Sequence, residues 1–153
     1  MYAFFYSFLV LAADQISKYM VRANMRPYES IPVIKNIFHL TYVNNTGAAF
    51  SMLRGKILFF TVFSSAVIIA LVYALIKLPL EKRIRLLLAL IIGGATGNLI
   101  DRVRFGYVVD FLDFRVWPVF NIADCAIVVG VAILAFIITF SKDPERLLSN
   151  NRR

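Results

Sequence analysis

Four aspartates stand in apolar stretches of this chain, and they are the residues best suited to carry chemistry. They are Asp14, Asp101, Asp110 and Asp124. An ionised carboxylate among apolar side chains is poorly solvated, so each of these groups needs a partner or a proton. A fifth aspartate, Asp113, alternates with Arg115, and we expect it on a solvated face. The sequence therefore directs attention to carboxylate chemistry.

Asp110 and Asp124 form the most informative combination. Asp110 lies in the apolar run YVVDFLDF, and Asp124 lies one turn into another apolar run, with Asn121 on nearly the same side. Two carboxylates at a partly dry boundary cannot both ionise comfortably, so one keeps its proton. The ionised carboxylate can then activate water while the protonated one hydrogen-bonds a scissile carbonyl. Such a pair hydrolyses a peptide by general acid and base catalysis.

A local alternative stays open, because the spacing alone does not show that Asp110 and Asp124 meet. Asn121 is also a good helix N-cap residue. Asp124 would then be a first-turn charge that the helix dipole favours.

Other catalytic chemistries have less support in the sequence. Zinc hydrolysis is disfavoured because there is no HExxH motif and His39 is the only histidine. No GxSxG motif is present. The single Cys125 excludes an intrachain disulfide, and we interpret it as a small packing residue, with a nucleophile paired to His39 as the alternative. We expect no metal and no cofactor.

Four apolar stretches must position these groups. They approach or meet the roughly 20 residues that a helix needs to cross a bilayer, and they cover residues 2–20, 57–76, 84–101 and 122–140. The chain is 60% hydrophobic with a mean hydropathy of +0.75. Asp14 and Lys18 interrupt the first stretch, which lacks a positive n-region and so fits a retained helix better than a cleaved signal peptide. We predict an all-α membrane protein with four transmembrane helices, forming one domain over residues 1–153.

The basic residues predict the orientation. Lys and Arg outnumber Asp and Glu by 17 to 9, and the excess lies between apolar runs, which favours a role in membrane orientation over nucleic-acid binding. The short loop 77–85 and the tail after Phe140 are both basic, so we expect them to be cytoplasmic. The basic residues between the first two stretches are spread over a longer segment. Both termini are therefore expected inside.

Two segments are then external, and both have strand character. The run IPVIKNIFHLTYV at 31–43 is rich in β-formers, and FLDFRV at 111–116 alternates as a half-buried strand does. We predict β-rich segments at about 29–55 and 106–120 that form a small β-cradle on the outer membrane face. Gly93 with Gly97, and Ala126 with Gly130, would let helices approach closely.

Five ordered blocks carry a family resemblance. They are AADQISK at 12–18, NNTGAAF at 44–50, GGATGNLIDR at 93–102, GYVVDF at 106–111 and FNIAD at 120–124. From about residue 10 to residue 130 they resemble the signature blocks of the bacterial lipoprotein signal peptidases, the signal peptidase II family.

The resemblance implies an intramembrane aspartyl endopeptidase of the bacterial cytoplasmic (inner) membrane. Such an enzyme removes the signal peptide from diacylglyceryl-modified prolipoproteins and cuts on the N-terminal side of the lipidated cysteine. It implies prolipoprotein substrates and membrane lipids as partners, with no nucleic acid, and we expect a monomer. It also implies four helices and an outward-facing β-cradle.

The resemblance also implies roles for individual residues. Asp110 and Asp124 match the family's catalytic pair. Asn45, Asn98, Arg102 and Asn121 match polar residues that line the family's site. Asp14 and Lys18 match a polar pair in its first helix. Asp101 ranks third among the carboxylates, with a supporting role and an ion pair to Arg102 expected.

Two positions depart from the family pattern. Only 13 residues separate Asp110 from Asp124, which shortens the outer loop, and Cys125 stands where a hydroxyl or alanine is usual. Neither departure is expected to change the chemistry.

Two other functions remain as alternatives. A proton-coupled carrier would use Asp14, Asp101 and Asp124 as a relay, but relay groups should be spread across the membrane, and Asp101, Asp110 and Asp124 are expected near one face. An assembly factor would leave Asp110 and Asp124 replaceable.

Overall fold

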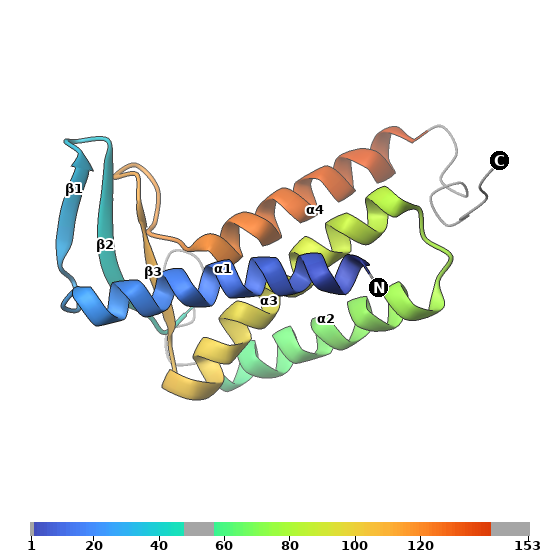
Figure 1. The fold of residues 1–153 in the computed structure, drawn as a ribbon, viewed down its shortest axis with the longest axis horizontal. Coiled ribbons are helices and arrows are strands. Elements are labelled where there is room, and N and C mark those ends of the chain that lie inside the picture. Colours follow the sequence, from blue (N-terminus) through green and yellow to red (C-terminus); the bar gives the residue numbers. More distant parts are fainter. Residues whose placement is uncertain (1, 48–56, 142–153) are drawn as a thin grey trace.

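The computed structural model describes residues 2–47 and 57–141. Within them four helices run side by side, and a three-stranded sheet lies across one end of the helices (Figure 1). In chain order the elements are α1 (Tyr2–Asn24), β1 (Ser30–Ile34), β2 (Phe38–Asn45), α2 (Ile57–Lys77), α3 (Lys82–Phe105), β3 (Val108–Asp113) and α4 (Ile122–Phe140). The start of α1, the turn between α2 and α3 and the end of α4 lie at the end opposite the sheet (Figure 1).

Three of the four helices are long and apolar enough to cross a membrane, namely α2, α3 and α4. The first helix is of similar length, but it carries Asp14, Lys18 and Arg22 and does not meet that criterion. The described chain is thus mostly helical, with three strong candidate spans and a small sheet. The fourth expected span, at 2–20, lies in α1 and is not among these candidates.

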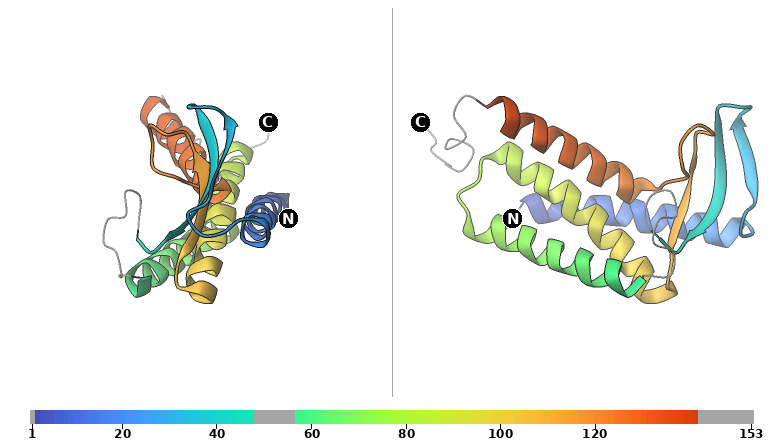
Figure 2. Two further views of the ribbon diagram at one scale, coloured as in Figure 1. Left: turned by 90° about the vertical axis from the view of Figure 1, so that its left-hand side faces the viewer. Right: turned by 180° about the vertical axis from the view of Figure 1, so that it is seen from behind.

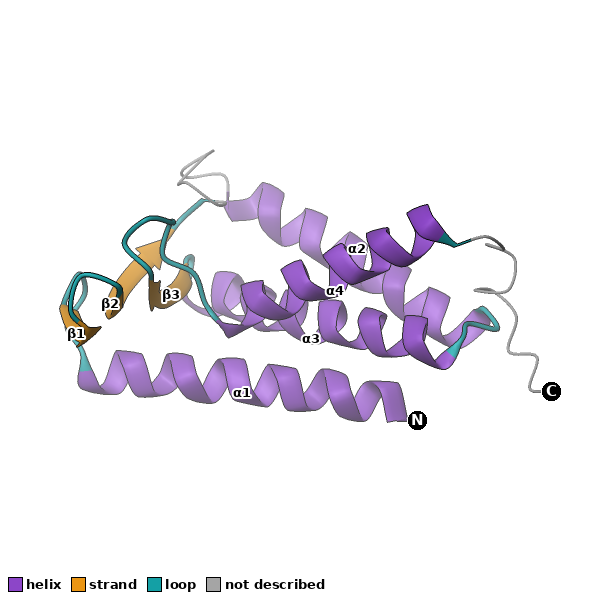
Figure 3. Cartoon of the chain, turned by 90° about the horizontal axis from the view of Figure 1, so that it is seen from above, coloured by secondary structure: helices purple, strands orange, loops and turns teal. Residues whose placement is uncertain are grey.

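Helix α3 occupies the centre of the bundle. It packs against α1, α2 and α4, and α1 and α2 lie on different sides of it (Figures 2 and 3). Glycines make this close packing possible, since a Cβ at Gly93 would come within 2.6 Å of the Ser7 carbonyl oxygen of α1. Gly97 faces the Asp14 carboxylate, and Gly130 of α4 faces Ile91 of α3. The two small-residue motifs therefore serve different helix pairs.

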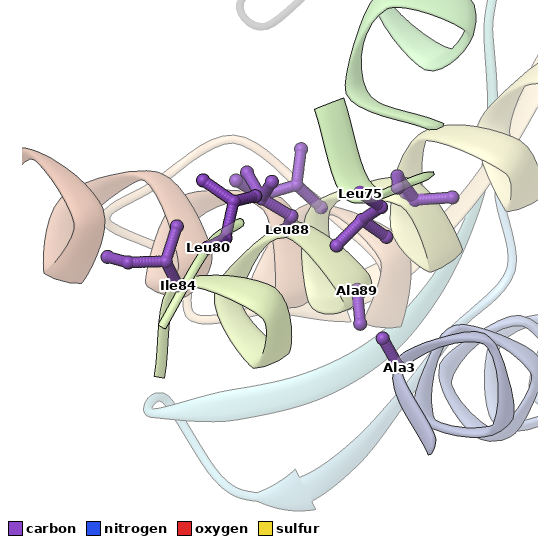
Figure 4. Close-up of a cluster of buried hydrophobic side chains, with 8 residues drawn as sticks. Ala3, Leu75, Leu80, Ile84, Leu88 and Ala89 are labelled. Atoms are coloured by element: carbon purple, nitrogen blue, oxygen red, sulfur yellow. The ribbon is translucent and has the colours of Figure 1, made fainter. Parts of the chain in front are cut away.

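Two apolar clusters lie toward the two ends of the helices. The cluster farther from the sheet is built from residues of α2, α3 and the start of α1, including Leu75, Leu88 and Ala3 (Figure 4). The other joins Val21 of α1 to Tyr42, Val109 and Phe111 of the sheet. On α1, Asp14 and Lys18 fall between the residues of these clusters and are themselves buried. A buried polar layer therefore separates two apolar layers.

The sheet is antiparallel with the order β1-β2-β3. The β-rich run at 31–43 forms most of a hairpin, in which the chain turns at Asn36, whose φ is 63°. The strand predicted at 111–116 is shifted, since β3 ends at Asp113 and Arg115 has a φ of 66°. In β2 and β3, Val43 pairs with Asp110. The strands thereby fix the position of Asp110 relative to α3.

Asp113 corrects a second expectation. It is buried rather than solvated, with 4% of its surface exposed. The Thr41 hydroxyl donates to its Oδ2 at 2.7 Å, and Arg115 forms an ion pair with the same oxygen at 3.0 Å. Although burial raises it, these hydrogen bonds hold the pKa of Asp113 below its ordinary value. Asp113 is a structural acceptor at the end of β3.

Some predicted features lie outside the described residues. They are the end of the NNTGAAF block at 48–50, the rest of the predicted β-rich segment up to residue 55, and the basic tail from residue 142 onward.

Candidate active site

A cavity of about 620 Å³ lies beside β3, α3 and the first half of α4. One part of its lining is polar and consists of Asn45, Asn98, Arg102, Asp110 and Asp124. The remainder is largely apolar and comes from Phe114, Trp117, Pro118, Val119, Phe120, Ile127, Val128 and Val129. Val128 and Val129 also belong to the exposed apolar surface of α4. The cavity therefore joins a polar pocket to an exposed apolar face of α4.

Asp110 is held in the wall of this cavity by β3. Its side chain is 2% exposed, and each oxygen accepts one amide N–H. Asn121 Nδ2 donates to Oδ1 at 2.6 Å, and Asn45 Nδ2 donates to Oδ2 at 2.8 Å. Burial, together with the nearby Asp124 carboxylate, raises the pKa of Asp110 to about 7, although both amides oppose the rise. Asp110 is thus able to hold or release a proton near neutral pH.

Asp124 is positioned by the start of α4. Asn121 is the N-cap, and its Oδ1 accepts the Asp124 backbone N–H at 2.9 Å while Asp124 Oδ2 accepts the Asn121 N–H at 3.3 Å. These two hydrogen bonds form a capping box. Asn121 is therefore the helix N-cap and Asp124 a first-turn residue, as the alternative interpretation of the sequence expected. The second oxygen, Oδ1, accepts Asn98 Nδ2 at 2.8 Å, and the side chain lines the cavity. Asp124 therefore caps a helix and faces the cavity at once.

Asp14 and Asp101 belong to a closed cluster around Lys18. Lys18 Nζ lies 2.8 Å from Asp14 Oδ2 and 3.0 Å from Asp101 Oδ2, and all three side chains are at most 2% exposed. Asp14 Oδ1 also accepts the Ala123 N–H at the start of α4, at 2.9 Å. None of the three is among the described residues that line the cavity. They join α1 to α3 and α4.

Asp101 differs from expectation in its partner. Its ion pair is with Lys18 of α1 and not with its neighbour Arg102. Successive residues of a helix project about 100° apart, so Asp101 points toward α1 while Arg102 points elsewhere. Asp101 Oδ2 also accepts the Val109 N–H at 3.1 Å, which fixes the residue before Asp110. Arg102 lines the cavity, with its guanidinium 5.6 Å from the Phe60 ring centroid.

Sequence reasoning missed Gln15. Its Nε2 lies 3.2 Å from Asp14 Oδ2, 3.1 Å from Asp101 Oδ1 and 3.2 Å from the Gly97 carbonyl oxygen. The only signal was its place in the AADQISK block, between Asp14 and Lys18.

Cys125 and His39 make separate contacts. Cys125 lines the cavity beside Asp124, whereas the hydrogen bond of His39 Nδ1 is to Ser30 on the sheet at 3.1 Å. Among the described residues, no group of three His, Cys, Asp or Glu side chains could hold a metal ion. Among the described residues, the polar side chains in and around the cavity include two carboxylates, three asparagine amides and one guanidinium.

Two carboxylates that share a cavity in a helical membrane protein are the arrangement of an aspartic hydrolase. The comparisons with known proteins agree with this class. Residues 6–140 match the family described as signal peptidase (SPase) II. The chain is 59% identical over 129 residues to the lipoprotein signal peptidase of Moorella thermoacetica, covering 84% of this chain and 86% of the relative. It is 54% identical over 132 residues to that of Caldanaerobacter subterraneus, covering 86% and 91%.

A solved bacterial membrane enzyme has the same fold. It superposes with a TM-score of 0.84 at 34% identity, over 99% of this chain and 94% of that one. A second superposes with a TM-score of 0.82 at 36% identity, over 92% and 93%. The chain belongs to the signal peptidase II family, whose members are aspartic proteases that cleave signal peptides from prolipoproteins.

Proposed function

We propose that Asp110 and Asp124 are the catalytic pair of this signal peptidase. One observation carries the proposal: among the described carboxylates, only these two line the cavity. The other buried pair, Asp14 and Asp101, is neutralised in part by Lys18 and is closed off. A hydrolytic carboxylate must reach both water and the scissile bond, so access distinguishes the pairs.

The proposed chemistry assigns different states to the two groups. Asp124 acts as the base, because it sits in the first turn of α4, where the helix dipole favours a negative charge. Asp110 carries the proton, because its burial and the nearby Asp124 carboxylate favour the neutral form more than its two amide donors favour the charged form. Asp124 takes a proton from water as the oxygen attacks the carbonyl, while Asp110 donates a hydrogen bond to the carbonyl oxygen. Collapse transfers a proton to the leaving amine and returns the pair to its starting state.

The cavity also suggests how the substrate lies. We propose that Arg102 hydrogen-bonds backbone carbonyl groups of the bound signal peptide, since a guanidinium offers five fixed donors. The apolar lining continues onto the exposed face of α4 and can take the acyl chains of a diacylglyceryl-modified cysteine. Cleavage then falls on the N-terminal side of that cysteine.

We propose that α1 is the fourth membrane span within a single membrane-embedded domain. Its 23 residues correspond to about 34 Å of helix, longer than the roughly 30 Å hydrocarbon core. Its charged Asp14 and Lys18 face α3, whereas Phe4, Phe8 and Ile16 are exposed on its outer side. The cost of charge at membrane depth is thereby reduced by pairing inside the bundle.

We propose further that both termini are cytoplasmic and that the sheet is external, in the bacterial inner membrane. The turn between α2 and α3, flanked by Lys77, Lys82 and Arg83, lies at the end opposite the sheet (Figure 1). A topology reporter fused at Pro79 should register as cytoplasmic and one at Asn36 as external. An external signal at Pro79 would contradict the orientation.

The test of the function uses purified protein in detergent with a lipidated prolipoprotein and its non-lipidated form. The released peptide is identified by mass. We expect cleavage before the modified cysteine, and cleavage of the lipidated substrate at least about tenfold faster, because the acyl chains hold the scissile bond at the cavity. Equal cleavage of both substrates would remove the assigned role of the apolar lining.

A further inference from the structure

Lys18 is a buried cation that the proposed chemistry does not use. It is 1% exposed, and its Nζ contacts Asp14 Oδ2 at 2.8 Å, Asp101 Oδ2 at 3.0 Å and Asn98 Oδ1 at 2.9 Å. An ammonium has three N–H groups, so each of these acceptors takes one. Two of the acceptors are carboxylates, but the third belongs to a side chain that also contacts Asp124. Lys18 therefore contacts a residue, Asn98, that lines the cavity.

Asn98 links Lys18 to Asp124, and the link has a direction. Its Oδ1 accepts from Lys18 and, at 3.2 Å, from Asn121 Nδ2, while its Nδ2 donates to Asp124 Oδ1 at 2.8 Å. Reversing the amide would place its NH2 group against the ammonium and its oxygen against the carboxylate. Both contacts would be repulsive. The ammonium, at the shorter distance, and Asn121 Nδ2 thus both favour the orientation in which Asn98 donates to Asp124.

The other two asparagines near the carboxylate pair are oriented differently. Asn121 Oδ1 accepts the Asp124 backbone N–H, and Asn45 Oδ1 accepts the Gly47 backbone N–H, both at 2.9 Å. Backbone groups therefore orient both amides toward Asp110. Asn98 alone of the three is oriented by a charged side chain, and that side chain comes from another helix. Lys18 is therefore the charged side chain whose contact with Asn98 can affect the hydrogen bond to Asp124.

We propose that Lys18 is a positioning residue that acts through Asn98 to keep Asp124 the ionised member of the catalytic pair. The inference rests on the proposed function, in which Asp124 is the base. A donor held toward a carboxylate stabilises its charged form, and a buried cation behind that donor strengthens the effect. The titratable or charged groups around Asp124 are Asp110 of β3, Asp101 and Arg102 of α3, Asp14 and Lys18 of α1, and Cys125 of α4.

The test must remove the ammonium without changing the net charge of the buried cluster. Replacing Lys18 alone would leave two buried carboxylates together. The combined variant Lys18→Met with Asp14→Asn changes two carboxylates and one ammonium into a single carboxylate, so the cluster keeps one net negative charge. The amide oxygen introduced by Asp14→Asn can still accept the Ala123 N–H that Asp14 accepts. The variant loses the contact to Asn98 and the ion pair of Lys18 with Asp101.

The readout is the pH dependence of kcat for cleavage of the lipidated substrate. Without the ammonium, Asp124 should become protonated at a higher pH. The acidic limb of kcat should therefore lie about one pH unit higher than in the wild type. KM should change less than about twofold, because Lys18 does not line the cavity. An acidic limb at the wild-type pH in the folded variant would overturn the proposal.

Gln15→Leu is the matched control. Gln15 contacts the same two carboxylates as Lys18, but none of its hydrogen bonds in the described part of the chain reaches Asn98. It should lower thermal stability and leave the acidic limb in place. A limb that moves equally in Gln15→Leu would overturn the proposal, because the effect would then come from general loosening of the cluster.

A second charge-balanced variant, Lys18→Met with Asp101→Asn, is measured if the first does not fold, and the same shift is expected. The proposed function itself is judged separately by Asp110→Asn and Asp124→Asn. If both of those are inactive while the acidic limb stays fixed in the Lys18 variants, only the inference about Lys18 fails.

Discussion

Among the described residues, two pairs of aspartates differ in their partners and in their access to the cavity. Asp14 and Asp101 share the Lys18 ammonium and line no part of the cavity described here. Asp110 and Asp124 accept hydrogen bonds from neutral amides and line the cavity. Asp14 and Asp101 are therefore tied to a cation away from the cavity, whereas Asp110 and Asp124 are accessible from it. The comparison separates a structural cluster from the proposed catalytic pair.

The two pairs are also joined, so they are not independent. Asp101 fixes the backbone beside Asp110 through the Val109 N–H, and Asp14 accepts the Ala123 N–H beside Asp124. Asp14 and Asp101, the closed pair, thus position the backbone beside Asp110 and Asp124, the open pair. This arrangement allows rigid positioning of the proposed catalytic carboxylates, with no described ion pair to either of them.

The largest effect should come from the open pair. Asp110→Asn or Asp124→Asn keeps the size and one of the two hydrogen bonds that each carboxylate accepts, but it prevents proton exchange, so kcat should fall by about 10³-fold or more. The double variant should be hardly worse than either single variant, because the two groups act as a unit. Single-turnover cleavage rates of the three variants provide the measurement. Multiplicative losses would show that the groups work separately.

The closed pair should respond in stability. Lys18→Met leaves Asp14 and Asp101 buried without their cation, and breaking a buried ion pair in this way costs about 3–5 kcal/mol. Thermal unfolding in detergent should show a clearly lowered transition temperature. An unchanged transition would mean that Lys18 contributes little to the fold.

A smaller effect should follow from Asn45→Ala. The Asn45 amide stabilises the ionised form of Asp110, so its loss should raise the pKa of Asp110 further above its ordinary value. Asp110 is active when protonated and loses activity as the pH rises through that pKa, so the alkaline limb of kcat should move to higher pH. The value of kcat should also fall about tenfold because one hydrogen bond that positions Asp110 is lost.

Asn44→Ala serves as the control for that experiment, since the Asn44 side chain has no described hydrogen bond to Asp110. Its alkaline limb should stay at the wild-type pH. Movement of the Asn45→Ala limb to lower pH would contradict the assignment of Asp110 as the proton carrier.

The sequence predicted the apolar helices well because their signal is local. Twenty consecutive apolar residues specify a helix in lipid whatever their neighbours are, and the run expected at 122–140 lies in α4 (Ile122–Phe140). The family blocks named Asp110 and Asp124, and the structure brings both to one cavity. Composition could not provide that juxtaposition, because β3 and α4 meet only through tertiary packing.

The misplaced expectations all involve contacts between elements. Asp101 was expected to pair with adjacent Arg102, but helix geometry directs it to Lys18 on another helix. Asp113 was expected in solvent because it alternates with Arg115, but the neighbouring strand supplies Thr41 and covers it. Gln15 gave no charge signal at all. Spacing along one chain segment does not show what a second segment places opposite it.

The most direct test of the central claim compares Asp101→Asn with Asp110→Asn in the same preparation, measuring cleavage rate and thermal stability for both. We predict that Asp110→Asn folds normally and loses about 10³-fold or more in kcat, whereas Asp101→Asn loses stability or substrate affinity more than chemistry. The opposite pattern, with Asp110→Asn near normal and Asp101→Asn well folded yet inactive, would move the catalytic pair to Asp101 and Asp124 and contradict the account.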